Sequence, residues 1–234
     1  MTTKRLLFPI SLNNNIFSTE RVLFGLNTIP EYYDELVFII ADQIQLYNRS
    51  FSVCNGNSFD ETIKKFYSGR TLFEQRSTWL SKLKNEFGSS NNFPVWTIYG
   101  FDDIADQMFT RIYRNIIIMY HTIPEFKKDI DNEALNHVSS YSGTANITDV
   151  NTKLSVSYII EELAASVRLH VYEDISDEYY LGKQLNSVLK LYYSDYGTTV
   201  FSIAGVESKP IKWRFFESNP DLKSPKWIER TLSV

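Results

Sequence analysis

Two short runs of uninterrupted apolar residues constrain the fold of this chain most strongly. They cover residues 6–10 and 36–41, and a polar residue follows each at once, Ser11 after the first and Asp42 after the second. Continuous rather than alternating hydrophobicity is typical of strands covered on both faces, as in a parallel sheet. Between the two runs, residues 18–26 have a helical pattern. The pattern predicts a β-α-β unit with a right-handed crossover.

The rest of the chain alternates in the same way. Further helices are predicted over residues 58–87, 101–121, 125–139, 153–169 and 179–193. Further strands are predicted over residues 93–99, 198–204 and 210–216, while residues 217–234 carry two prolines and show no clear pattern. We therefore expect one α/β domain over residues 1–234, with an open, mainly parallel sheet and helices on both faces.

The composition excludes several classes of protein. Hydrophobic residues make up 43% of the 234 residues and charged residues 22%, which argues against disorder. The net charge of −4 means that any contact with RNA must come from a local basic patch. The longest apolar runs fall far short of the ~20 residues of a membrane helix. We expect a cytoplasmic protein that does not contact a membrane.

Cysteine and histidine are scarce. Cys54 is the only cysteine, so the chain cannot form an internal disulfide or a site built on several cysteines. His121, His137 and His170 are scattered without the spacing of metal ligands, and we interpret them as ordinary core or surface residues. No metal is expected.

Ser11 is the first candidate for chemistry. In open parallel sheets the ligand crevice lies beyond the carboxyl ends of the strands, where Ser11 and the amides of residues 13–15 follow the first strand. Ser11 is either a nucleophile or a turn serine that caps the next helix. The absence of Gly-x-Ser-x-Gly argues against a lipase-type nucleophile. Glycine-rich phosphate loops are absent, so the sequence contains no motif that indicates a bound nucleotide.

Tyr158 and Glu162 are the second candidate. They lie four residues apart on an otherwise apolar helix face, so they lie one turn apart. A carboxylate and a phenol there either belong to a site, where they bind an ammonium or move a proton, or mark a partly solvated helix edge. Glu161 is expected to face solvent.

A basic helix face is the candidate for phosphate contact. The alternative is that this face only contacts water, as most lysine-rich helix faces do. Its residues are Lys64, Lys65, Arg70, Arg76, Lys82 and Lys84.

Taken in order, these features resemble the tRNA-dependent cyclodipeptide synthases. The resemblance starts with Ser11-x-x-Asn14 and a following Phe-Ser, continues with Asp42 and the basic helix, and ends with Tyr-x-x-x-Glu at Tyr158 and Glu162 and a late tyrosine. Smaller matches between them are a Phe-x-Val step at residues 93–95 and a Pro-Glu-Phe step at residues 124–126.

The late tyrosine is best matched by Tyr179, because Leu185 and Leu189 follow it at the family's spacing. The chain departs from the family's pattern at Pro9, where glycine is usual, and at Tyr180, where histidine or proline usually follows the tyrosine. Tyr180 therefore stays open as the alternative assignment.

The resemblance implies a Rossmann-like fold similar to the catalytic domain of class I tyrosyl- and tryptophanyl-tRNA synthetases. It implies synthesis of cyclic dipeptides from two aminoacyl-tRNAs by a monomer that needs no cofactor and no ATP step. The implied catalytic residues are Ser11, Asn14, Tyr158, Glu162 and Tyr179. The implied substrate pocket is lined by Leu7, Pro9, Ile39, Ala41, Ala165 and Ser166, and the basic face binds tRNA. Two alternatives stay open, a non-catalytic RNA-binding or interaction module and a serine acyl hydrolase.

Overall fold

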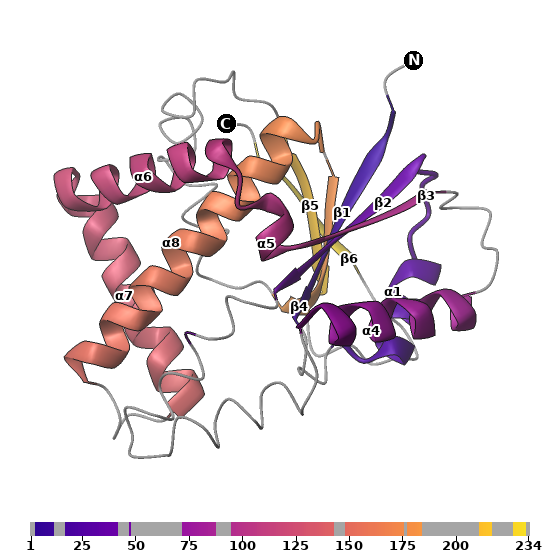
Figure 1. Ribbon diagram of the computed structural model, residues 1–234, viewed down its shortest axis with the longest axis horizontal. Coiled ribbons are helices and arrows are strands. Elements are labelled where there is room, and N and C mark those ends of the chain that lie inside the picture. The colour runs from indigo at the N-terminus through magenta and orange to yellow at the C-terminus, as the bar shows by residue number, and fades with distance from the viewer. Residues whose placement is uncertain are drawn as a thin grey trace.

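In the described part of the chain, a six-stranded sheet forms the centre of the molecule, in the order β3-β2-β1-β4-β5-β6 (Figure 1). Its strands are β1 (Arg5–Ser11), β2 (Glu35–Ala41), β3 (Val95–Gly100), β4 (Asp177–Lys183), β5 (Ile211–Phe216) and β6 (Trp227–Leu232). The first five strands are parallel, and β6 pairs antiparallel with β5 at the edge. The computed structural model describes residues 3–11, 17–41, 47, 72–87, 95–142, 148–175, 177–183, 211–216 and 227–232.

The two apolar runs form the middle of the sheet, as predicted. β1 pairs with β2 in a register that runs from Arg5 opposite Glu35 to Ser11 opposite Ala41. Nearly all their apolar side chains are buried, because the strands are covered on both faces. Both strands therefore end at the same level of the sheet.

Helices cover both faces (Figure 1). On one face α1 (Thr19–Asn27) and α4 (Leu72–Phe87) pack against β1, β2 and β4. On the other face α5 (Phe101–Ile104) and α8 (Asp149–Tyr172) pack against β1 and β2. Two more helices, α6 (Gln107–Thr122) and α7 (Pro124–Ser142), build a second core with α8. The predicted α/β class, with a mainly parallel sheet between helices, is confirmed.

The helix ends follow from local residue chemistry. The Asp106 carboxylate caps α6 by accepting hydrogen bonds from the amides of Met108 and Phe109, and Thr148 caps α8 by accepting one from the Asn151 amide. Pro124 is the first residue of α7, where its missing N–H costs no helical hydrogen bond. The predicted break between two helices at Pro124 is therefore confirmed.

The predicted helix over residues 179–193 is wrong where the structure describes it. Residues Asp177–Lys183 form β4, a strand between β1 and β5. A short apolar segment such as Tyr179-Tyr180-Leu181 fits a strand as well as a helix, and the leucines further along the chain suggested the helical period. Tyrosine is also enriched in strands.

Other predictions fall partly or wholly outside the described residues. Of the long helix expected over residues 58–87, α4 is the described part, and the strand expected over residues 198–204 lies outside. The strand expected over residues 210–216 is confirmed as β5, and the unassigned tail contributes β6.

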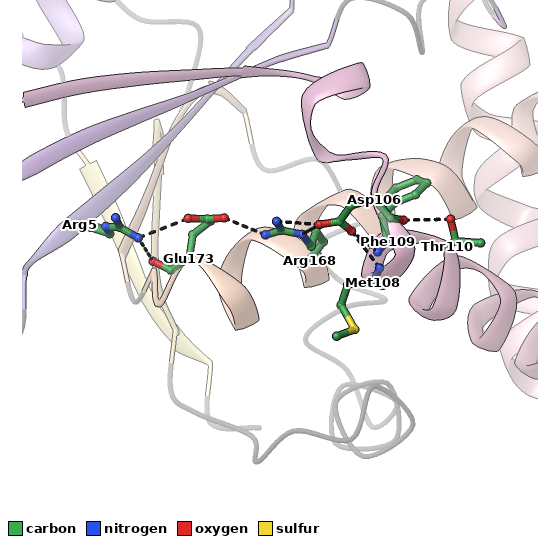
Figure 2. A network of polar contacts seen from close by, with 7 residues as sticks. All are labelled: Arg5, Asp106, Met108, Phe109, Thr110, Arg168 and Glu173. Atoms are coloured by element: carbon green, nitrogen blue, oxygen red, sulfur yellow. Dashed lines mark hydrogen bonds and ion pairs between the residues drawn. The ribbon is translucent and has the colours of Figure 1, made fainter.

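A chain of ion pairs fixes α8 against the sheet and against α6 (Figure 2). Arg5, at the start of β1, donates to the carbonyl oxygen of Glu173 at 2.7 Å, just beyond the end of α8. Arg168 on α8 pairs with Glu173 at 2.9 Å and with Asp106, the α6 cap, at 2.9 Å. The start of β1, the end of α8 and the start of α6 are therefore held together by charged groups.

Candidate active site

The candidate site lies at the carboxyl ends of β1 and β2. Ser11 is the last residue of β1 and lies opposite Ala41, the last residue of β2. The side chain of Ser11 and the whole of Asn14 and Asp42 lie outside the described part of the structure. The backbone position of Ser11 agrees with the rule that ligands of open parallel sheets bind beyond the carboxyl ends of the strands.

The chain leaves the Arg5–Glu173 contact along β1 and arrives at it along α8, so this contact is a common reference point for both elements. Six residues of strand bring the chain from Arg5 to Ser11, about 20 Å at ~3.3 Å per residue. Eleven residues of helix lead back from Glu173 to Glu162, about 17 Å at 1.5 Å per residue, and one further turn leads to Tyr158. Ser11, Glu162 and Tyr158 thus lie at similar distances from the Arg5–Glu173 contact, when each distance is measured along the strand or helix that carries the residue.

Glu162 is half-buried and has an unusual electrostatic environment. Burial, together with the charges of Glu178 on β4 and Glu133 on α7, raises the pKa of the Glu162 carboxyl to about 7. A carboxyl with such a pKa can accept a proton and release it again near neutral pH.

Tyr158 and His137 lie against each other. Their ring centroids are 4.9 Å apart, and the His137 Nδ1 atom lies 2.7 Å from the hydroxyl of Ser155, one turn before Tyr158 on α8. Burial lowers the pKa of His137, which favours the neutral imidazole. The interpretation of His137 as an ordinary residue therefore misses a neighbour of Tyr158.

Tyr179 and Tyr180 point to opposite faces of β4, as alternation along a strand requires. The Tyr179 phenol donates to Glu31 at 2.7 Å, and the Arg214 guanidinium lies 4.8 Å from the centre of its ring. Arg214 also pairs with Asp177 at 2.9 Å. Tyr179 thus belongs to a cluster of charged side chains on the face of the sheet that α1 covers.

Tyr180, in contrast, shares the electrostatic environment of Glu162. Burial and the negative charges of Glu162 and Glu178 raise the pKa of the Tyr180 phenol, and its ring packs 5.7 Å from that of Phe17. The charge of Glu162 thus acts on Tyr180 and not on Tyr179. If residues 177–181 had been interpreted as a strand, whose side chains alternate between two faces, the two tyrosines would have been assigned to opposite faces.

The expected pocket residues gather only in part. Leu7, Ile39 and Ala165 are buried in one cluster between the sheet and α8, and Ala41 packs against it. Four aromatic rings pack against the same cluster, from Tyr47, Tyr99, Phe109 and Tyr158, and of these the sequence pointed only to Tyr158. Pro9 and Ser166 are half-buried and are not members of it.

Glu161 faces solvent only in part, whereas the sequence predicted a solvent-facing side chain. It is half-buried, and its carboxylate accepts a hydrogen bond from the Tyr47 phenol, whose pKa is raised by burial and by this bond. Helix α8 packs against neighbours on both sides, so few of its positions stay open. The sequence pattern suggested that only one face of this helix is buried, and this prediction underestimated how many side chains of α8 are covered.

The expected basic face is described only in part. Lys82 and Lys84 are exposed on α4, which agrees with a face open to a partner. The side chain of Arg76 and the whole of Lys64, Lys65 and Arg70 lie outside the described residues. No group of described residues has the His, Cys, Asp and Glu arrangement of a metal site.

Comparison with solved structures identifies the fold. A cyclodipeptide synthase from Fluoribacter dumoffii is 17% identical and superposes with a TM-score of 0.63, with 81% of each chain covered. One from Candidatus Glomeribacter gigasporarum, solved bound to Phe-tRNAPhe, is 15% identical and has a TM-score of 0.56, covering 83% of this chain and 84% of that one.

A third neighbour connects this fold to the synthetases. A Mycobacterium tuberculosis protein is 12% identical with a TM-score of 0.56, over 78% of this chain and 74% of its own, and its structure demonstrates that cyclodipeptide synthetases are related to type I tRNA synthetases. No protein-family model and no curated protein sequence matches the chain. None of the described helices is long and apolar enough to cross a membrane. The predicted resemblance is thus confirmed as a shared fold.

Proposed function

We propose that this chain is a divergent tRNA-dependent cyclodipeptide synthase that acts as a monomer in the cytoplasm, with residues 1–234 as its catalytic domain. The observation that carries the proposal is the half-buried Glu162 carboxyl, whose pKa is raised to about 7 by burial and neighbouring charge, on the helix that packs beside β1. The shared fold supports it independently. Neither cofactor nor ATP enters the proposed reaction, because the substrates arrive as activated esters.

In the first step the Ser11 hydroxyl attacks the carbonyl carbon of an aminoacyl-tRNA. A bond forms between the serine oxygen and that carbon, the bond to the terminal ribose oxygen of the tRNA breaks, and the serine proton passes to the ribose oxygen. The products are an aminoacyl-enzyme and free tRNA. Asn14, three residues after Ser11, helps to position the aminoacyl group.

In the second step the tethered amino acid becomes the nucleophile. Tyr158 and Glu162 bind its ammonium group, and the Glu162 carboxylate accepts a proton so that the free amine can attack a second aminoacyl ester. A peptide bond forms, the bond to the ribose oxygen of the second tRNA breaks, and the remaining amine proton passes to that oxygen, while the proton held by Glu162 is released to water. Glu162 is suited to this because its pKa lies close to neutral pH.

In the third step the new terminal amine attacks the ester that joins the dipeptide to Ser11. The second peptide bond closes the ring, the bond to the serine oxygen breaks, and the amine proton passes to that oxygen through Glu162. Tyr180 replaces Tyr179 in the proposed site, because it shares the environment of Glu162 whereas Tyr179 is bound to Glu31.

The binding surfaces follow from the same arrangement. The first amino acid side chain lies against the cluster between β1, β2 and α8, among Leu7, Pro9, Ile39, Ala41, Ala165 and Ser166. The two tRNA substrates place their phosphates along the basic face that includes Lys82 and Lys84. The protein as a whole is acidic, so this local positive charge supplies the attraction.

Expression in a bacterium tests the function directly, because the host supplies aminoacyl-tRNAs. We expect mass spectrometry of the medium to detect cyclic dipeptides, which identifies the two amino acids as well. The Glu162→Gln variant should yield none, whereas Asp149→Asn, which removes an exposed carboxylate from the same helix, should yield the wild-type amount. A wild-type culture without cyclic dipeptides, at normal levels of soluble protein, would refute the proposal and leave a non-catalytic RNA-binding module.

A further inference from the structure

His137 on α7 contacts two side chains of the neighbouring helix α8. Its Nδ1 atom lies 2.7 Å from the hydroxyl oxygen of Ser155, and its ring centroid lies 4.9 Å from that of Tyr158. Ser155 and Tyr158 are three residues apart, so they are neighbours on the surface of one helix. A single imidazole thus joins a buried hydroxyl to the phenol ring that the proposed reaction uses.

The position of His137 is one where an apolar residue is expected. Helix α7 contributes Phe126, Ile130 and Ala134 to the core that it shares with α8, and His137 follows Ala134 by three residues on the same face. A polar ring there loses hydration, and its hydrogen bond to Ser155, which is 0% exposed, offsets that loss. Because an apolar pair of similar shape would fill the space without this requirement, core packing alone does not explain the histidine.

The pair does not act as a nucleophile and its base. A serine hydroxyl at hydrogen-bonding distance from an imidazole nitrogen has the geometry of an activated nucleophile. Ser155 is completely buried, however, so a substrate ester has no access to its oxygen. What the hydrogen bond to Ser155 does accomplish is to fix the plane of the His137 ring.

Tyr158 lies where such a fixed ring matters. It packs against two clusters, the core that α8 forms with α6 and α7 and the cluster between α8 and the sheet. Apolar packing is not directional, so these contacts hold the phenol ring in place without setting its direction. A hydrogen bond is directional, and the bond between Ser155 and His137 therefore supplies an oriented surface against which the Tyr158 ring lies.

We propose that His137 is a positioning residue for Tyr158: held by Ser155, its imidazole fixes the orientation of the Tyr158 ring and so directs the phenol toward the ammonium group of the tethered amino acid. The inference rests on the proposed function for the identity of that ammonium group. The orientation of the ring is a property of the free protein and can be measured without any substrate.

A positioning role determines which step of the reaction is affected. Loading of Ser11 precedes the binding of the ammonium group by Tyr158, so it should proceed normally without His137. Formation of the first peptide bond needs the ammonium group in place and should slow by about 10- to 100-fold, since a misplacement of about 1 Å has effects of this size. The aminoacyl-enzyme should therefore accumulate, and the mass of the intact protein shows this directly.

A double-mutant cycle with His137→Asn and Tyr158→Phe tests the inference. Asparagine can still bond to Ser155 but lacks the ring that lies against Tyr158. His137→Asn should slow cyclic dipeptide formation by about 10-fold or more when Tyr158 is present and by less than about 2-fold in Tyr158→Phe, because the phenol that His137 positions is then already missing. Equal losses in both backgrounds would overturn the inference. If His137→Asn fails to fold, Ser155→Ala takes its place in the cycle, with the same pattern expected.

His121→Asn is the matched control for the histidine. It removes an exposed imidazole whose ring centroid likewise lies close to that of a tyrosine, 5.1 Å from Tyr120 on α6. This variant should form cyclic dipeptides at the wild-type rate and accumulate no aminoacyl-enzyme. A loss as large as that of His137→Asn would show that any histidine removed from beside a tyrosine slows the reaction, and would overturn the inference.

NMR of protein with carbon-13 in its tyrosine rings measures the orientation separately, with Tyr158→Phe to identify the signal of Tyr158. Ser155→Ala should shift this signal, because it releases the imidazole that lies against the ring. Ser157→Ala is the matched control, because the Ser157 hydroxyl donates to the carbonyl oxygen of Lys153 within α8, and it should leave the signal in place. An unshifted signal in folded Ser155→Ala would overturn the inference. The expected shift in a protein that makes no cyclic dipeptide would instead refute the proposed function alone.

Discussion

Adjacent residues of one strand can have unrelated roles, and Tyr179 and Tyr180 are an example. The Tyr179 phenol donates to Glu31 beneath one face of the sheet, whereas the charge of Glu162 acts on Tyr180 on the other face. The sequence match favoured Tyr179 because of leucines that follow it. Spacing along a chain does not reveal which face of a strand a side chain occupies until the element is known to be a strand.

Substitution of each tyrosine by phenylalanine separates the two roles. Tyr180→Phe should reduce cyclic dipeptide formation by about 100-fold or more, because it removes the hydroxyl that shares the environment of Glu162 in the proposed site, with little loss of stability. Tyr179→Phe should lower the free energy of unfolding by about 1.5–3 kcal/mol, because it removes a hydrogen bond to a charged group, and should leave the rate unchanged. Rates and urea unfolding of both variants check this, and the opposite assignment of effects would restore Tyr179 to the site.

At the scale of elements, long and strongly periodic segments were predicted best. The strands over residues 6–10 and 36–41 and the helix that became α8 needed only the spacing of their apolar residues. β4 was misassigned because a short apolar segment has no distinctive period, and only its place between β1 and β5 makes it a strand. The contacts that orient α8, such as that between Arg5 and Glu173, join residues far apart in sequence and have no local signal.

Asp106 should matter more than its exposed position suggests. Its carboxylate caps α6 through two backbone amides and also pairs with Arg168 on α8. Asp106→Ala should therefore lower the free energy of unfolding by about 1–3 kcal/mol. Asp149→Ala is the matched control, because Asp149 also lies at a helix start but forms only an exposed ion pair with Lys153, worth about 0.5 kcal/mol or less. Equal effects of the two variants in urea unfolding would contradict this account.

At the scale of the whole molecule, the fold class was predictable but the grouping of the site was not. Alternation of apolar strands and periodic helices indicated a mainly parallel sheet between helices, and the resemblance pointed to the right fold. The sequence indicated Ser11 and Glu162 as candidate site residues, because a hydroxyl follows a buried strand and a carboxylate lies on an apolar helix face. The carboxylates that surround Glu162 come from β4 and α7, and only the tertiary fold brings them together.

The overall charge makes tRNA binding depend on a local surface. Lys82→Glu with Lys84→Glu should weaken binding of aminoacyl-tRNA and reduce the dependence of the affinity on salt, by about one unit of slope for each phosphate that a lysine no longer neutralises. Lys128→Glu with Lys153→Glu, which makes the same change of charge on α7 and α8, should weaken it much less. Filter binding over a range of salt concentrations measures both, and equal losses of affinity would show that net charge rather than the α4 face controls binding.

The covalent step at Ser11 is the central claim, and the mass of the intact protein tests it most directly. Purified protein mixed with aminoacyl-tRNA and trapped in acid should gain the mass of one aminoacyl group, and in Glu162→Gln this adduct should accumulate because the next step is blocked. Ser11→Ala should show no adduct and form no cyclic dipeptide. An adduct of the same yield on Ser11→Ala, or cyclic dipeptide made by that variant at the wild-type rate, would contradict the account.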